Sequence, residues 1–426
     1  MRRKYAMTVA TVSLVALGLA ACSPGSQESG TSTGNGDEDV TLGWNFWVQG
    51  EAADAAWEAL ADEVTEHYPN ISVELNQVPF GDYFTRYQSQ LAAGEAACIV
   101  GMQSLRLPAF AETMEPLDEY LEQEGFDESE WNEGALTALQ REGSQYAIPI
   151  GFSTMQMFYN KDLFAEAGVD EPTDGWTIED FESAAVQITE ETGVPAFGQS
   201  FSDMHMFSML YAYNGATPVT SEGELDLTSD EMHEAFAWYA SLSTELGVAS
   251  TPASSAEVPW GEQQWLAGNV AMAVDGTWNT ASNATDTDFE VGVVTLPAGE
   301  QGVNTFSANS GFGVTTTCEH PQEAVQAITV LTNEESAVAS AEAGNETARL
   351  SGQETYYEGL GESVSEEYKE QAQETAEASS AVAQPFVSTD NWEAVVSEIS
   401  RQFILAYTGD QPAADALEAT QQAAGN

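Results

Sequence analysis

The sequence predicts an α/β fold built around a mainly parallel sheet. After residue 39, short runs rich in β-branched and aromatic residues alternate with amphipathic helical patterns. Strands separated by helices at this spacing are typical of a parallel sheet covered by helices. Apolar residues make up 42% of the chain and aromatic residues 10%, which is enough for a sizeable core. The length allows two or three domains of ordinary size.

Three strands and two helices are expected in the first part of this body. In chain order they are a strand at 40–47, a helix with Ala55, Leu60 and Val64 on its apolar face that ends at Tyr68, a strand at 71–75, a helix at 83–91 that Gly94 ends, and a buried strand at 98–102.

The middle of the chain is more helical, and capping signals mark where its helices begin. Thr177 and Asp180 form a capping box for a helix that Gly193 ends. A second box, 228–231, opens a helix with Phe236, Tyr239 and Leu242 on its apolar side. Shorter strands are expected at 270–274, 289–296 and 312–316, and Pro321 is placed in the first turn of a helix that continues over 324–331.

The N-terminus indicates export. Arg2, Arg3 and Lys4 precede an apolar stretch at 6–18 that is too short for a permanent membrane helix. The stretch closes with Leu-Ala-Ala-Cys22, which matches the lipobox of bacterial lipoproteins. We therefore expect a signal peptide at 1–22, lipidation of Cys22 and a flexible tether at 23–39. The alternative is an ordinary signal peptide cut at a small-residue site.

The charge excludes several classes of partner. The chain has 69 acidic and 10 basic residues, and three of the basic residues lie in the predicted signal peptide. Such a surface repels nucleic acid and anionic lipid headgroups, and few cations remain to pair with phosphorylated or carboxylate-rich ligands. Self-repulsion on this scale is tolerable where salt screens it. The composition fits a salt-tolerant host or simply an acidic secreted protein.

Five blocks, in one order across the chain, resemble the family 1 extracellular solute-binding proteins, which include maltose-binding protein. They are Tyr146 to Gly151 with Phe158 to Phe164, Trp265 to Trp278 with its Asp275-Gly276-Thr277-Trp278 ending, Gly292 to Gly299, Gly311 to Val330, and Phe403 to Leu417. Two positions depart from the family: Cys98 stands where an acidic residue is usual, and 344–349 lacks a frequent proline.

The resemblance implies the two-lobe, type II periplasmic-binding-protein fold. Its N-lobe would comprise 40–150 plus 305–344 and its C-lobe 151–304 plus 345–426, joined by a discontinuous hinge. The implied protein is a monomeric, lipid-anchored receptor on the outer face of the membrane that captures a sugar or oligosaccharide and delivers it to ABC permease subunits. Closure around the ligand would be a hinge motion. No enzymatic activity, metal or cofactor is expected.

Aromatic platforms are expected to bind the flat face of a sugar ring. In the resemblance, Trp278 matches a stacking position and Trp392 matches a second one, and the alternative for Trp278 is packing within the lobe. Trp47, Gln49 and Glu51 lie where the first strand runs into its loop, the usual ligand edge of an open α/β sheet.

Polar candidates come from four other positions. Arg106 follows the third strand and would bind hydroxyls bidentately, or pair with a surface acid. Ser153 lies at the first implied lobe crossing. Asp203 and His205 precede a segment that contributes C-lobe contacts in relatives, although a lone histidine in such a run is usually packed or exposed.

Two other classes of protein are kept as alternatives. A secreted glycoside-active enzyme would need two carboxylates facing one sugar, and no motif locates such a pair. A metal-ion-binding receptor is suggested by the adjacent Tyr356 and Tyr357, but neighbouring glutamates favour an exposed helix there.

The resemblance also implies a disulfide. In the implied fold, the strand from Phe312 runs antiparallel beside the third strand, which places Cys318 opposite Cys98. Exported proteins meet an oxidising environment, so we expect these cysteines to be bonded. Two buried free thiols are the alternative.

Overall fold

The computed structural model describes residues 39–220, 222–251 and 260–425. The predicted signal peptide, Cys22 and all of the predicted tether except Asp39 lie outside these residues. Within them, no helix combines the length and apolar character needed to cross a membrane.

Among the described residues, ten strands form one sheet and two form a small hairpin. The strands are β1 Val40–Trp47, β2 Ile71–Val78, β3 Ile99–Gln103, β4 Gln140–Arg141, β5 Ser144–Gln145, β6 Ala147–Asn160, β7 Phe197–Gly198, β8 Ala249–Ser250, β9 Met272–Gly276, β10 Val291–Val294, β11 Thr305–Val314 and β12 Ala383–Pro385.

Helices follow most strands. The α-helices are α1 Glu51–His67, α2 Phe80–Ala93, α3 Leu107–Phe110, α4 Asp118–Glu124, α5 Glu133–Ala138, α6 Lys161–Ala167, α7 Ile178–Thr192, α8 Asp203–Asn214, α9 Asp230–Thr244, α10 Trp260–Leu266, α11 Thr280–Thr285, α12 Pro321–Leu331, α13 Glu334–Glu342, α14 Leu350–Ser363, α15 Glu366–Ser380, α16 Trp392–Tyr407 and α17 Ala413–Ala424. Short 3₁₀ turns are η1 Ser104–Arg106, η2 Ala111–Thr113, η3 Glu128–Glu130 and η4 Thr277–Asn279.

Local sequence signals placed several of these elements correctly. The predicted capping box at Thr177 and Asp180 is present, and Gly193 ends α7 with a φ of 72°. Gly94 ends α2 in the same left-handed conformation, where a residue without a Cβ is favoured. The box at 228–231 is shifted, because Ser229 caps α9. Ala55 is exposed, and Trp57, Leu60 and Val64 form the buried face of α1.

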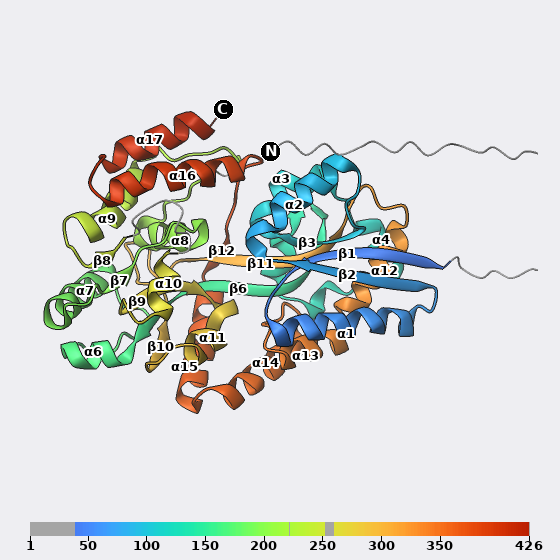
Figure 1. The fold of residues 1–426 in the computed structure, drawn as a ribbon, viewed down its shortest axis with the longest axis horizontal. Coiled ribbons are helices and arrows are strands. Elements are labelled where there is room, and N and C mark those ends of the chain that lie inside the picture. Colours follow the sequence, from blue (N-terminus) through green and yellow to red (C-terminus); the bar gives the residue numbers. More distant parts are fainter. Residues whose placement is uncertain (1–38, 221, 252–259, 426) are drawn as a thin grey trace, which may run out of the picture. The chain divides into compact units, whose positions relative to one another are not determined.

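The large sheet is mixed: in the described residues five of its strand pairings are parallel and four antiparallel, so the expectation of a mainly parallel sheet holds only in part. Its order is β2-β1-β3-β11-β6-β9-β7-β8, with β10 on β6 and β12 on β11. β1 pairs in parallel with β2 and β3. However, β11 runs antiparallel to both β3 and β6, and β6 runs antiparallel to β9 and β10. The reason is that β6 and β11 cross between two groups of elements in opposite directions (Figure 1).

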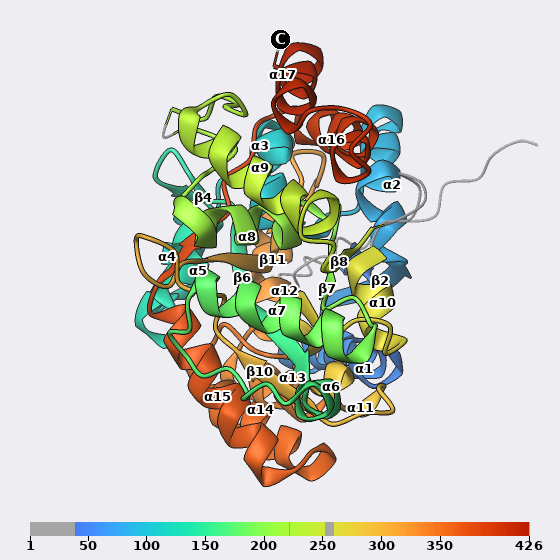
Figure 2. The ribbon, with the colours of Figure 1, turned by 90° about the vertical axis from the view of Figure 1, so that its left-hand side faces the viewer.

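In the part of the chain that the structure describes, two large hydrophobic cores lie along this sheet. The first is built from residues between Val40 and Phe152 and between Phe312 and Ala348. The second is built mainly from residues between Met155 and Leu296 and between Phe386 and Ala424, and it includes Leu105 and Phe306. The 14-residue β6 belongs to both, with Ile148 in the first core and Met157 in the second. α8, α9, α16 and α17 surround part of the second core (Figure 2).

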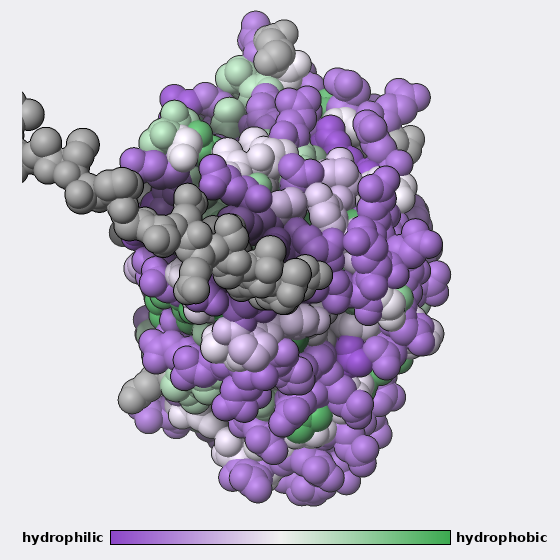
Figure 3. Space-filling model, turned by 90° about the vertical axis from the view of Figure 1, so that its right-hand side faces the viewer, coloured by the Kyte–Doolittle hydropathy of each residue, from purple (hydrophilic) through white to green (hydrophobic). Residues whose placement is uncertain are grey.

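The face of the molecule in Figure 3 is predominantly hydrophilic, with small and scattered apolar patches. The acidic excess of the sequence therefore accompanies an ordinary arrangement, with apolar side chains gathered in the cores and polar ones covering this face.

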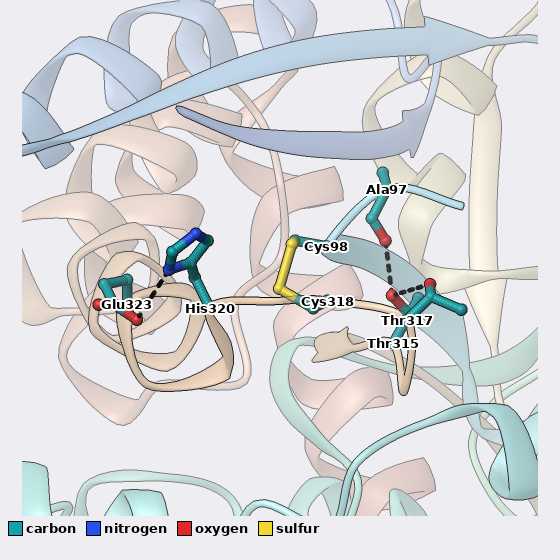
Figure 4. The surroundings of a disulfide bond; sticks show 7 residues. All are labelled: Ala97, Cys98, Thr315, Thr317, Cys318, His320 and Glu323. Carbon is teal, nitrogen blue, oxygen red and sulfur yellow. Dashed lines mark hydrogen bonds and ion pairs between the residues drawn. A yellow bond between two sulfur atoms is a disulfide. The ribbon is translucent and has the colours of Figure 1, made fainter. Parts of the chain in front are cut away.

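The disulfide implied by the resemblance is present. Cys98 lies just before β3 and Cys318 just after β11, and their Cα atoms are 4.6 Å apart (Figure 4). β11 runs antiparallel to β3 as the resemblance implied. Thr315 strengthens the same junction, because its backbone N donates to Cys98 O and its hydroxyl to Ala97 O. The bridge joins residues 220 positions apart and ties the start of α12 to the first core.

Candidate functional site

The turn after β9 presents a tryptophan to solvent. β9 ends at Gly276, and η4 carries Trp278. The indole ring folds back over Gly276, where a Cβ would lie 2.1 Å from the ring, so glycine is needed for this arrangement. Trp278 is 41% exposed, whereas the other eight tryptophans whose side chains the structure describes are at most 8% exposed. The turn therefore offers a flat aromatic face for a ligand.

His205 lies beside this ring, on the first turn of α8. The two ring centroids are 6.2 Å apart, at an interplanar angle of 75°. His205 Nε2 is 3.1 Å from Glu262 Oε1 and 3.4 Å from Asp275 Oδ1. Burial favours the neutral imidazole, but the charges of these carboxylates and of Asp203 outweigh it and raise the pKa of His205 to about 9. His205 is thus a cation at neutral pH.

The two carboxylates are fixed by other polar groups. Asp275 accepts hydrogen bonds from the backbone N of Gly276 at 2.8 Å, from Asn279 Nδ2 at 3.0 Å and from Asn283 Nδ2 at 3.0 Å. The hydroxyl of Ser200 lies 3.1 Å and 3.2 Å from the two carboxylate oxygens of Glu262. These hydrogen bonds fix the carboxylates beside His205, and such preorganised polar groups are what a binding site requires.

Arg106 connects the two cores. It lies in η1 after β3, and its guanidinium pairs with Asp203, at 3.9 Å, and with Glu393. Asp203 begins α8, and Glu393 lies in the first turn of α16. Leu105 packs into the second core, and its carbonyl accepts a hydrogen bond from Ser388. The structure thus brings two predicted site residues, Arg106 and Asp203, into direct contact.

Trp392 does not offer an open ring, and the expectation of a platform there is wrong in this structure. The side chain is 1% exposed. Phe207 and Phe386 pack against its ring, with centroids 6.0 Å and 5.5 Å away. Its indole Nε1 donates to Asp203 Oδ2 at 2.7 Å. Trp392 therefore serves the second core and orients Asp203.

Ser153 is connected to the Trp278 turn through a residue that the sequence did not single out. Ser153 is buried on β6, and its hydroxyl donates to Glu346 Oε2 at 3.4 Å. The hydroxyl of Thr277, the residue before Trp278, donates to the same oxygen. Glu346 is half-buried, and burial raises its pKa to about 7, although these two hydrogen bonds lower it.

The candidates at the end of β1 make their described contacts within the first core. Trp47 is 7% exposed and packs edge-on against Phe80 and Tyr83, so it lacks an open ring face. Gln49 is exposed and accepts a hydrogen bond from Trp57 Nε1 at 2.6 Å. Glu51 begins α1, and its side chain lies outside the described part of the structure.

Within the described residues, no group of three or more His, Cys, Asp or Glu side chains is arranged to hold a metal ion. Tyr356 and Tyr357 do not form the exposed pair that was expected, because Tyr356 is 4% exposed. A surface hollow of about 590 Å³ lies between α6 and α7, lined by Asp170, Glu171, Asp174 and their neighbours. It includes none of the predicted site residues.

Four carboxylates of this region were not predicted as site residues: Glu262, Asp275, Glu346 and Glu393. A signal existed for Asp275, because it lies in the block that resembles the family and ends at Trp278. No local pattern distinguishes the three glutamates from the rest of the 69 acidic residues.

The fold and site define a binding protein with two lobes, and the comparisons agree. The profile of the bacterial extracellular solute-binding proteins matches residues 32–338, and the chain belongs to this family. It adopts the two-lobe type II fold.

Three proteins illustrate the similarity. The arabinooligosaccharide-binding protein of Bacillus subtilis is 26% identical over 221 residues, which cover 51% of this chain and 49% of that protein. The chain thus spans about half the length of the curated relatives it matches. An ABC substrate-binding protein from Listeria monocytogenes, solved with cycloalternan, is 25% identical with a TM-score of 0.77, covering 90% of this chain and 97% of that one. The cyclic alpha-maltosyl-1,6-maltose binding protein of Arthrobacter globiformis is 20% identical with a TM-score of 0.72, covering 91% and 98%.

Proposed function

We propose that this protein captures an uncharged sugar or oligosaccharide at the site around Trp278 and delivers it to the permease subunits of an ABC importer. The observation that carries the proposal is the exposed ring of Trp278 beside the fixed polar groups His205, Glu262 and Asp275. A sugar needs this combination, because it has a weakly apolar ring face and a belt of hydroxyls.

The relatives support the carbohydrate class. The names of the Bacillus subtilis and Arthrobacter globiformis proteins specify oligosaccharides, and the Listeria monocytogenes structure contains one. The electrostatics support an uncharged ligand, because four carboxylates, Asp203, Glu262, Asp275 and Glu393, surround only two cations, His205 and Arg106. Anionic sugars would meet net repulsion.

The ligand would bind between an N-lobe of 40–150 plus 305–344 and a C-lobe of 151–304 plus 345–426, whose hinge includes β6 and β11. The two cores lie on either side of this division, apart from Leu105 and Phe306 of the second core and Phe152 and Ala348 of the first. The working protein would be a monomer, tethered outside the cell membrane by lipid on Cys22. The leader with its lipobox supports this anchoring, and mass spectrometry of the N-terminal peptide from native membranes would detect diacylated Cys22.

A thermal-shift screen tests the proposal. The protein would be heated with arabino-, manno- and malto-oligosaccharides, with their monosaccharides, and with glucuronate as the anionic control. A neutral sugar at a hundredfold excess over its Kd stabilises the folded state by about 2.7 kcal/mol, which raises the melting temperature measurably. No shift with any neutral sugar, or a shift with glucuronate alone, would contradict the proposal. Chromatography of the incubated sugars should recover them intact, and cleavage products would indicate a glycoside-active enzyme instead.

A further inference from the structure

The carboxyl group of Glu346 joins three segments that are far apart in the sequence. Glu346 lies in the loop between α13 and α14. Its Oε2 atom accepts hydrogen bonds from Ser153 on β6 and from Thr277 in η4. Thr277 Oγ1 also accepts a hydrogen bond from the backbone N of Thr154 at 3.3 Å. One carboxylate oxygen and one hydroxyl therefore fix the end of β9 against β6.

The backbone around Glu346 is held to the same stretch of β6. The backbone N of Ala348 donates to Ile150 O at 3.1 Å. A Cβ at Gly151 would lie 3.4 Å from the carbonyl oxygen of Glu346, which shows how closely the two backbones approach. Residues 147–154 are where β6 pairs with β11, between the two cores. The contact thus lies where the chain passes from one core to the other.

We infer that Glu346 is a positioning residue of the ligand site, which holds the Trp278 turn on β6 through Thr277 and makes the position of the Trp278 ring depend on whether the Glu346 carboxyl is ionised. The link is short, because Thr277 is bonded covalently to Trp278. The consequence for ligand affinity rests on the proposed function, whereas the effect on the ring itself does not.

The ionisation occurs in the physiological range. Burial raises the pKa of Glu346 to about 7, and the hydrogen bonds from Thr277 and Ser153 oppose this increase. The groups facing Glu346 from β6 and η4 are hydroxyls that do not titrate near this pH. Tyr356 and Tyr357 face it from α14, and burial raises the pKa of both well above 10. Arg349, in the same loop, is paired with Glu130. Glu346 is therefore the group at this contact that titrates near pH 7.

The direction of the effect follows from hydrogen-bond strength. An ionised carboxylate accepts roughly twice as strong a hydrogen bond as a neutral acceptor. Above pH 7 the Thr277 and Ser153 bonds tighten, and the Trp278 turn is held more firmly. Below pH 7 the bonds weaken and the turn loosens. A ligand that stacks on the ring must then order it, so its affinity falls about three- to tenfold at low pH.

A pH titration of the ligand-free protein tests the positioning role. Subtracting the fluorescence of Trp278→Phe from that of the wild type isolates the signal of Trp278. This difference should change in a step near pH 7 between pH 5.5 and 8.5. Glu346→Gln keeps the shape of the side chain but cannot ionise, so the step should vanish. Glu354→Gln, an exposed position on α14, should retain it.

A second pair of variants separates this role from a structural one. Thr277→Val removes the hydrogen bond that lowers the pKa of Glu346, so the midpoint should move to higher pH, while Thr277→Ser keeps the hydroxyl and should leave it unchanged. A wild-type signal that stays flat, or a step that persists in Glu346→Gln, overturns the inference.

Arabinotriose serves as the ligand probe. If it binds, its Kd should be about three- to tenfold larger at pH 5.5 than at pH 8, and Glu346→Gln should show the weaker affinity at both. A Kd that is independent of pH in the wild type would overturn the effect on affinity. Failure of arabinotriose to bind counts against the proposed function for this sugar, and the ligand-free titration still decides the role of Glu346.

Discussion

Trp278 and Trp392 were both predicted to stack on a sugar ring, but the exposure of their side chains differs greatly in the structure. Trp278, after β9, is 41% exposed, and Trp392, at the start of α16, is 1% exposed. Each contacts a side chain of α8: the Trp278 ring lies next to His205, and the indole N–H of Trp392 donates a hydrogen bond to Asp203. One ring faces solvent and the other is part of a core.

The difference comes from what precedes each ring. Trp278 lies two residues after Gly276, and its ring occupies the space that a side chain on Gly276 would need, on the surface of the turn. Trp392 follows the segment that carries Phe386, whose ring packs against it, and Phe207 of α8 covers it further. A match to the family therefore predicts which tryptophans are candidates for stacking, while the neighbouring side chains decide whether a ring is exposed to a ligand.

The largest expected effect that separates the two tryptophans is on stability. Trp392→Ala removes a buried ring and leaves Asp203 without its indole donor, so the free energy of unfolding should fall by about 3–5 kcal/mol. Trp278→Ala changes an exposed side chain and should stay within about 0.5 kcal/mol of the wild type. Guanidinium unfolding curves of both variants measure this. Equal losses would remove the distinction between a core ring and a surface ring.

A pH effect should be specific to the neighbourhood of Trp278. The folded-state pKa of His205 is raised from 6.5 to about 9. The raised pKa means that His205 stabilises the fold fully below pH 6.5, and that this contribution is lost as the pH rises through 9. The loss is roughly 3 kcal/mol at most. Unfolding free energies at pH 6.5 and 9.5 should differ less in His205→Gln than in the wild type, and an identical pH dependence would show that His205 is not charged in the folded state.

Ligand affinity should respond to the exposed ring. Trp278→Ala should lose about 1–3 kcal/mol of binding free energy for whichever neutral sugar the screen identifies, because stacking on the ring is removed. Leu246→Ala is the matched control, since Leu246 is also 41% exposed but lies in the loop after α9. Isothermal titration of both variants gives the comparison. An unchanged Kd in Trp278→Ala would exclude this ring from the site.

The smallest effect should be the response of the whole molecule to salt. With 69 acidic residues against 10 basic ones, distant like charges repel each other when they are unscreened. The melting temperature should rise by several degrees as sodium chloride increases from near zero toward 1 M. Because the Trp392 contacts are buried, Trp392→Ala should show the same slope as the wild type. A flat or falling curve would contradict the interpretation of a salt-adapted surface.

Local patterns predicted the elements better than their assembly. The capping box at Thr177 and the left-handed glycines Gly94 and Gly193 depend on neighbouring residues only, and they mark the ends of helices correctly. The direction of β11 against β3 depends on a crossing between lobes, which strand spacing does not encode. The resemblance supplied that direction, and with it the Cys98–Cys318 bridge.

The candidate site was likewise predicted mainly where the resemblance to the family extends. Asp203, His205 and Trp278 were predicted as candidates because they lie in or next to segments that resemble the family. Glu346 reaches Thr277 across 69 positions of sequence, through a loop whose pattern departs from the family. Nothing in its local sequence indicates that it is half-buried, and so its shifted pKa is a property of the tertiary structure alone.

The central claim is that a ligand covers Trp278 and leaves Trp392 unchanged in its core, and oxidation by N-bromosuccinimide tests it directly. The protein would be treated briefly with and without a saturating concentration of the neutral sugar that binds in the screen, and each tryptophan peptide would then be quantified by mass spectrometry. We expect Trp278 to be oxidised rapidly in the free protein and protected by the sugar, and Trp392 to remain unmodified in both samples. Equal oxidation of Trp278 with and without the sugar, or ligand-dependent protection of Trp392 instead, would contradict the account.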